Sequence, residues 1–200
     1  MSASLTPVSP DPLSAVATAL LAQIGSLFPA ASFEQRMMPA QLTLKNWTEL
    51  SRRMPFVGLG WEGFTPMAPG TPGGASGTAH YSLFLAVKNA NGAGARYFGD
   101  GVGLGLFAMA SVAIAGLHRW KMASSGTVLV QKVMHGALDG ADESIAMTVL
   151  SLDVVGVVVD IGGTIAGFTV ADFKQLAATY TSALTGETLV ADTYPVGNWS

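Results

Sequence analysis

Residues 145–160 are the part of the sequence that most constrains the fold, because a run so rich in Val, Leu and Met favours a long β-strand. The apolar centre of this run predicts burial on both faces, which places the strand inside a sheet. Residues 126–135 form a second such run, and Gly140 predicts a turn between the two, so we expect a hairpin. In residues 78–88, one set of alternate positions is fully apolar, which predicts a further strand.

Two stretches have the periodicity of helices. Apolar residues recur every three or four positions from Leu13 to Phe28, where Asp11 is placed to cap the helix and Pro12 suits its first position. A second helix is expected from Asp100 through about Lys121, after a loop over residues 89–99.

Shorter segments complete the expected order of elements. Gly and Pro are concentrated in residues 66–77, which predicts a flexible hairpin tip or arm. The other expectations are a strand at 31–38, a short helix or irregular loop at 42–54, an extended segment from Pro55 to Phe64, and a short helix near 170–184.

These elements predict a single domain of the α/β (α+β) class, with a mostly antiparallel sheet covered by helices. A length of 200 residues suits one domain with a sizeable core. Residues 12–160 are expected to form this domain, with an N-terminal arm at 1–11 and a C-terminal extension at 161–200.

The composition excludes several kinds of site. Without Cys, the chain has no disulfide, thiolate metal site or Cys nucleophile. Half of the residues are apolar, only 12% are charged, and the mean hydropathy is +0.43, which raises the question of a membrane. The longest uncharged helical candidate, residues 101–117, is short for a bilayer and contains four glycines, and residues 1–12 have no basic residue that would begin a signal peptide. We therefore expect no membrane partner and apolar surface covered by other protein chains.

Charge is divided unevenly along the chain, although the net charge is only −3. Residues 1–132 hold nine basic and five acidic residues, whereas residues 133–200 hold one and eight, so the two parts carry +4 and −7. We hypothesise that 133–200 supplies mainly acidic and 42–96 mainly basic contact surface; the alternative is that folding interleaves the two parts and removes the asymmetry. The candidate contact residues between subunits or with partners are Arg52, Arg53, Trp61, Arg96, Asp139, Asp142 and Glu143.

No motif points to a cofactor or to nucleophilic catalysis. The segment Gly103–Ala108 matches the G-x-G-x-x-A form, but no strand runs directly into it and no acidic residue stands near position 128 to hold a ribose. Its glycines favour close packing of a helix on a sheet or on a neighbouring copy. Ser76 lies in a loop-like segment that misses the nucleophile-elbow pattern.

Metal and nucleic-acid sites are equally poorly supported. His80, His118 and His135 lack metal-ligand spacing, although His80 and His135 could approach each other across a sheet. The acidic cluster of Asp139, Asp142 and Glu143 lacks the order of a calcium loop and favours a solvated turn. Arg52 and Arg53 are the only adjacent basic pair, too little for phosphate-driven binding. We therefore expect neither an enzyme nor a cofactor, metal or sequence-specific nucleic-acid binder.

The order of elements resembles the tail-terminator (tail-completion) proteins of long-tailed bacteriophages, particularly the Mu-like group. The similarity covers roughly residues 12–160. It lies in LSAVATALLAQIGSLFP, in HYSLFLAV followed by GVGLGLFAMASVAIAGLHRW, and in the closing pair TVLVQKVMHG and SIAMTVLSLDV. The arm at 66–77 and the forty residues after Asp160 depart from the family pattern.

The resemblance implies a structural virion protein, assembled in the host cytoplasm. Six copies would form a ring on the head-proximal end of the tail tube, stop its polymerisation and join it to the neck. The implied partners are other copies, the tail-tube protein, the neck or connector protein and, as a further candidate, the sheath protein, with DNA passing through the ring. A tail-tube or neck protein of the same particle is the nearest alternative. A membrane-associated protein and a small-molecule enzyme using the turn at Gly99–Gly105 are weaker alternatives.

Overall fold

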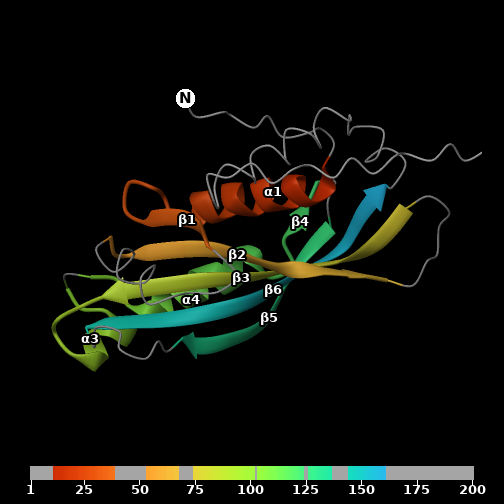
Figure 1. The fold of residues 1–200 in the computed structure, drawn as a ribbon. Helices are drawn as coiled ribbons and strands as arrows, with labels where there is room; N and C mark the ends of the chain where they lie inside the picture. Colours follow the sequence, from red (N-terminus) through yellow and green to blue (C-terminus); the bar gives the residue numbers. More distant parts are fainter. Residues whose placement is uncertain are drawn as a thin grey trace, which may run out of the picture.

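A six-stranded sheet in the order β1-β2-β3-β6-β5-β4 forms the body of the protein (Figure 1). The computed structural model describes residues 11–38, 53–67, 74–101, 103–123, 126–136 and 144–160. The strands are β1 (Glu34–Met38), β2 (Phe56–Pro66), β3 (Gly74–Lys88), β4 (Lys121–Met122), β5 (Gly126–Gly136) and β6 (Ile145–Asp160), and the helices are α1 (Pro12–Leu27), α3 (Ala93–Phe98) and α4 (Leu106–Leu117). β1 and β2 are parallel and the other adjacent pairs are antiparallel, so the predicted fold class is confirmed.

The strand predicted to be internal is β6, which lies between β3 and β5. Its antiparallel pairing with β5 confirms the expected hairpin, although the turn at Gly140 lies outside the described residues. The prediction that both faces of this strand are buried holds only near its beginning, where Ala146, Met147 and Thr148 are all buried. Asp153 lies on the face opposite the helices, and Val158 is exposed near the strand's end.

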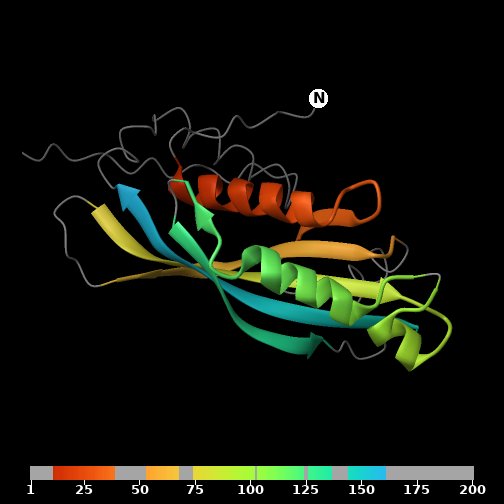
Figure 2. The same cartoon turned by 180° about the vertical axis from the view of Figure 1, so that it is seen from behind.

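The helices α1 and α4 cover one face of the sheet (Figure 2). Asp11 caps α1 as predicted, because its Oδ1 accepts a hydrogen bond of 3.0 Å from the backbone N of Leu13. The buried residues spaced along the two helices are Val16, Leu20, Ile24 and Phe28, and Leu106, Met109, Ala113 and Leu117. Gly116 lets the helices approach, since a Cβ there would meet the side chain of Leu27. No helix within the described residues is long and apolar enough to cross a bilayer.

The helix predicted from Asp100 begins only at Leu106 and ends at Leu117, and the expected loop before it contains α3. A hydrogen-bonded loop replaces the first helical turns, because Asp100 Oδ1 accepts from the backbone N of Gly103 at 2.8 Å. Its Oδ2 accepts from the side-chain amides of Asn89 and Asn91 at 3.0 and 2.9 Å. These bonds offer the backbone an alternative to a helix.

Other boundaries also differ from the predictions. β2 continues to Pro66 and β3 begins at Gly74, so the two ends of the expected arm at 66–77 are strand, and Ser76 lies in β3 rather than in a loop. The middle of the arm, residues 68–73, lies outside the described residues. The ladder extends there because Gly77 permits backbone contact with Thr65, where a Cβ would clash. β1 begins at Glu34 rather than at residue 31, because residues 30–32 form a turn. The segments 1–10, 39–52 and 161–200, with the expectations placed on them, lie outside the described residues.

Register shifts interrupt three of the strand pairings. They fall between Trp61 and Gly63 in β2, between Val155 and Val157 in β6, opposite Thr78 and Gly77, and between Val130 and Lys132 in β5. Such bulges strengthen the right-handed twist of a sheet. The strongly twisted strands in Figure 1 agree with this expectation.

Because the hydroxyl of Tyr81 is buried, the stability of the fold should decrease at alkaline pH. This hydroxyl has no hydrogen-bond partner among the described groups, and burial, with a smaller effect from Asp11, raises the pKa of Tyr81 to about 12. The unfolded chain releases this proton near pH 10 whereas the native chain keeps it, so stability falls as pH rises from 10 towards 12. We expect Tyr81→Phe to be as stable at pH 7, or about 1 kcal/mol more stable, and to lose less stability between pH 9 and 11 in urea unfolding. Equal losses in both proteins would contradict this prediction.

The turn before α4 requires glycine at position 105. A Cβ on Gly105 would overlap the backbone of Gly99 and Phe98, whereas a Cβ on Gly101 would meet nothing within 4 Å. We expect Gly105→Ala to lower the free energy of unfolding by about 1–3 kcal/mol, and Gly101→Ala to change it by less than about 0.5 kcal/mol. Thermal and urea unfolding of the two variants provide the measurement.

Candidate interaction surface

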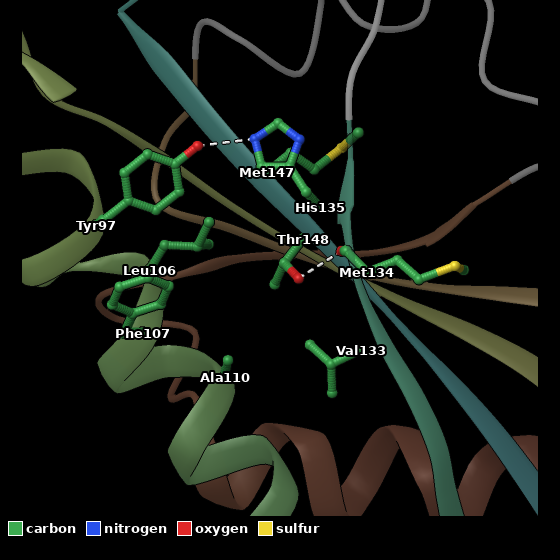
Figure 3. Close-up of a pocket in the computed structure, with 9 residues that line it drawn as sticks. All are labelled: Tyr97, Leu106, Phe107, Ala110, Val133, Met134, His135, Met147 and Thr148. Carbon is green, nitrogen blue, oxygen red and sulfur yellow. Dashed lines mark hydrogen bonds between the residues drawn. The ribbon is translucent and has the colours of Figure 1, made fainter.

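An apolar groove lies between α4 and β5, and we call it the α4–β5 groove. It consists of two cavities of about 220 and 260 Å³ that share Val133. Figure 3 shows the first, with side chains of α3 and α4 on one side and those of β5 and β6 on the other. Its lining residues are Tyr97, Leu106, Phe107, Ala110, Val133, Met134, His135, Met147 and Thr148, and the second is lined by Ile114, His118, Val130, Gln131, Lys132 and Val133.

The few polar groups of the first cavity are hydrogen-bonded to one another. Tyr97 Oη and His135 Nε2 are 2.7 Å apart, and Thr148 Oγ1 donates to the backbone O of Met134 at 2.7 Å. The ring of Phe107 lies 5.4 Å from that of Tyr97, centroid to centroid. A wall of this kind offers contact area to an apolar partner rather than a reactive group.

Exposed apolar side chains gather around this groove. Phe98, at the end of α3, is 79% exposed and meets Phe107 edge to face. Ile114 on α4 and Val133 and Met134 on β5 are also exposed, as is Leu104 just before α4. Grouped exposed apolar residues mark surfaces that bind another molecule.

One edge of β5 is unpaired beside the groove. β4 pairs with β5 only at Gly126 and Thr127, and two backbone hydrogen bonds extend the contact to Val128. His118 Nδ1 then accepts from the backbone N of Val130 at 3.2 Å, in place of a strand. Beyond Val130, no strand in the described part of the chain pairs with this edge. An unpaired edge accepts an extended segment.

The surroundings of this edge are basic. Arg119, Lys121 and Lys132 are exposed, and none forms an ion pair within the described ranges. The groove therefore combines an apolar floor with a cationic rim. An apolar segment flanked by carboxylates has matching chemistry.

The opposite face of the sheet carries a row of polar residues across four strands. His80 Nε2 lies 2.8 Å from Thr65 Oγ1, and His80 Nδ1 lies 2.7 Å from Asp153 Oδ1. Gln131 Nε2 donates to Asp153 Oδ2 at 3.0 Å. The order of hydroxyl, imidazole and carboxylate resembles a hydrolytic relay, but Thr65, His80 and Asp153 line neither cavity of the groove. The network satisfies polar groups of the central strands.

His80 and His135 do not approach each other, which the sequence had left open. His80 alternates with the core residues Ala79 and Tyr81 and so points away from the helices, whereas His135 contacts Tyr97 on the helix-covered face. The two rings are on opposite faces of the sheet.

The contact residues predicted from the sequence are dispersed. Arg53 is exposed, with its Nη1 3.5 Å from Glu34 Oε1. A hydrogen bond from Arg36 lowers the pKa of Glu34, as does the charge of Arg53. Trp61 packs edge to face on Tyr81 at 5.2 Å, so its ring contributes to the core. Arg96 is half-buried in α3, and the residues outside the described part are Arg52, Asp139, Asp142 and Glu143.

Sequence reasoning missed the α4–β5 groove. The available signal was the apolar character of nearly all sides of α4, including Phe107, Val112 and Ile114, which exceeds what one sheet face can cover. No protein-family model matches the chain, and no curated protein is significantly similar to it. Function is therefore inferred from the α4–β5 groove with the unpaired edge of β5, and from the resemblance in the order of elements.

The polar row makes a measurable prediction for stability. Asp153→Ala leaves His80 and Gln131 without their shared acceptor, so we expect a loss of about 1–3 kcal/mol. Lys132→Ala, on exposed β5, should change stability by less than about 0.5 kcal/mol. A double-mutant cycle of His80→Ala with Asp153→Ala should give a coupling energy of at least about 0.5 kcal/mol, and additive effects would show that the pair does not interact.

Proposed function

We propose that the protein is a structural component of a phage particle, a tail terminator whose copies form a ring on the head-proximal end of the tail tube. The ring ends tube polymerisation and offers its other side to the neck or connector. Its partners are further copies, the tube protein and the neck protein, with the sheath protein as a further candidate, and the virion is its location.

The α4–β5 groove is the observation that carries this proposal. Apolar side chains including Phe98, Phe107 and Val133 are held in place by the fold and left uncovered by the described parts of the same chain. A contact with an adjacent copy removes that surface from water, which favours association. The α/β domain with a mostly antiparallel sheet is also the architecture that the resemblance to tail terminators implies.

A ring requires a heterologous contact, in which one surface of each copy binds a different surface of the next. The sheet suits such a contact because its two edges differ. β1 at one edge carries the Glu34–Arg36 ion pair, whereas β5 at the other carries Lys132 beside the groove. The two sides of a subunit therefore have different chemistry.

Light scattering and negative-stain microscopy of the purified chain test the proposal. We expect single rings with the mass of a hexamer. Long tubes or stacks of rings would identify a tail-tube protein instead. A chain that stays monomeric at concentrations of tens of micromolar would overturn the ring.

Two similarly exposed positions on α4 test the contribution of the groove to assembly. Ile114 lines the groove and is 38% exposed, whereas Val112 is 41% exposed but lines neither cavity. Ile114→Asp should weaken ring formation by at least about tenfold in concentration, because a carboxylate would be buried against an apolar partner. Val112→Asp introduces the same charge on the same helix and should leave assembly nearly unchanged. Equal loss in both variants would show that the groove is not the contact.

A further inference from the structure

We propose that the α4–β5 groove and the unpaired edge of β5 bind the C-terminal segment, residues 161–200, of a neighbouring copy. This inference rests on the proposed ring and names the segment that joins its subunits. Three observations support it: the chemistry of the groove, the sequence of the segment and the place where β6 ends.

The edge of β5 provides the backbone groups that hold an extended segment. Pairing with β4 ends near Val128, and the backbone N of Val130 bonds to the side chain of His118. From Gln131 to Gly136 the edge runs alongside the cavities, where Val133 is 42% exposed. A segment added here gains main-chain hydrogen bonds from the strand and apolar contacts from the groove at once.

The C-terminal segment has the complementary composition. Its forty residues contain Lys174 against Asp172, Glu187 and Asp192, a net charge of −2. Apolar and aromatic residues are spread through it, among them Phe168, Leu189 and Tyr194. Carboxylates flanking apolar side chains match the cations Arg119, Lys121 and Lys132 around an apolar floor.

The course of β6 allows binding to a neighbour. β6 ends at Asp160, opposite Gly74, whereas the first cavity lies beside Met147 and Thr148 near its beginning and the second lies beside Val130, opposite Leu152. The twelve steps from Thr148 to Asp160 span about 40 Å at a rise of about 3.3 Å per residue. Figure 1 shows the arrow of β6 ending at the end of the sheet away from α3. The segment therefore begins at the end of the sheet away from the first cavity, and its forty residues are long enough to reach the groove of the next copy in a ring.

The absence of Cys permits a direct test with the full chain. The variant Val133→Cys is prepared with natural-abundance nitrogen (light) and with ¹⁵N (heavy). The two forms are assembled together in equal amounts, and the Cys is labelled with a benzophenone maleimide. Trypsin cuts after Lys132 and Lys174, so residues 175–200 form a separate peptide. We expect photo-cross-links from position 133 to residues 161–200, with light-to-heavy pairs in about half of the products.

Met37→Cys on β1, where Met37 is 49% exposed, is the matched control at the other edge of the sheet. It should give at most one fifth of the yield to residues 161–200. Lys132→Glu combined with Val133→Cys should lower the yield several-fold if the cationic rim attracts the segment, and an unchanged yield contradicts that charge pairing.

The outcomes separate this inference from the proposed ring. If rings form but position 133 cross-links to other parts of the chain, or to nothing, the C-terminal segment is not the occupant and the ring stands. If only light-light and heavy-heavy products form, the segment binds the groove of its own copy, and binding to a neighbouring copy is contradicted. If no ring forms, both proposals fail.

Discussion

The antiparallel pairing of β3 with β6 is the constraint on which the rest of the structure depends. It runs from Gly74–Asp160 to Lys88–Ile145 and joins two strands that are far apart in the sequence. β2 is added on the β3 side and β5 on the β6 side. On one face, residues such as Leu83 and Leu150, opposite each other in this ladder, form the floor on which α1 and α4 pack. The other face holds the polar row through His80 and Asp153.

Local sequence patterns were sufficient for the fold class and for the central place of β6. The alternation in residues 78–88 and the apolar run at 145–160 correctly predicted β3 and β6. One face of each strand packs against the helices, so its apolar residues recur at every second position. The capped helix α1 follows from Asp11 and Pro12 for similarly local reasons. The errors fall where distant backbone decides the structure. Gly77 meets the strand of Thr65, and Asp100 collects hydrogen bonds from Asn89 and Asn91.

The candidate surface was less accessible to sequence reasoning than the fold. Arg53 and Arg96 were predicted as contact residues because of their charge, and Trp61 because of its aromatic ring. In the structure, the ring of Trp61 packs against Tyr81 at the margin of the core. The groove is made by residues of α3, α4, β5 and β6, and none of them has a local pattern that indicates a shared cavity. They meet only in the folded protein, where α4 lies beside β5 and leaves Phe107 and Ile114 exposed. A surface of this kind follows from three-dimensional arrangement rather than from a motif.

The three bulges have a mechanical consequence. Since each leaves one residue unpaired in one strand only, Glu62 in β2, Gly156 in β6 and Gln131 in β5, the extra twist is carried by the backbone of the sheet. The two ends of the sheet are therefore rotated relative to each other about the strand direction. In the proposed ring, surface substitutions would change how strongly a neighbour is bound, whereas the twist of the backbone would set the directions that the two edges of a subunit face. The angle between successive subunits would thus depend on the strands as well as on the contact surface.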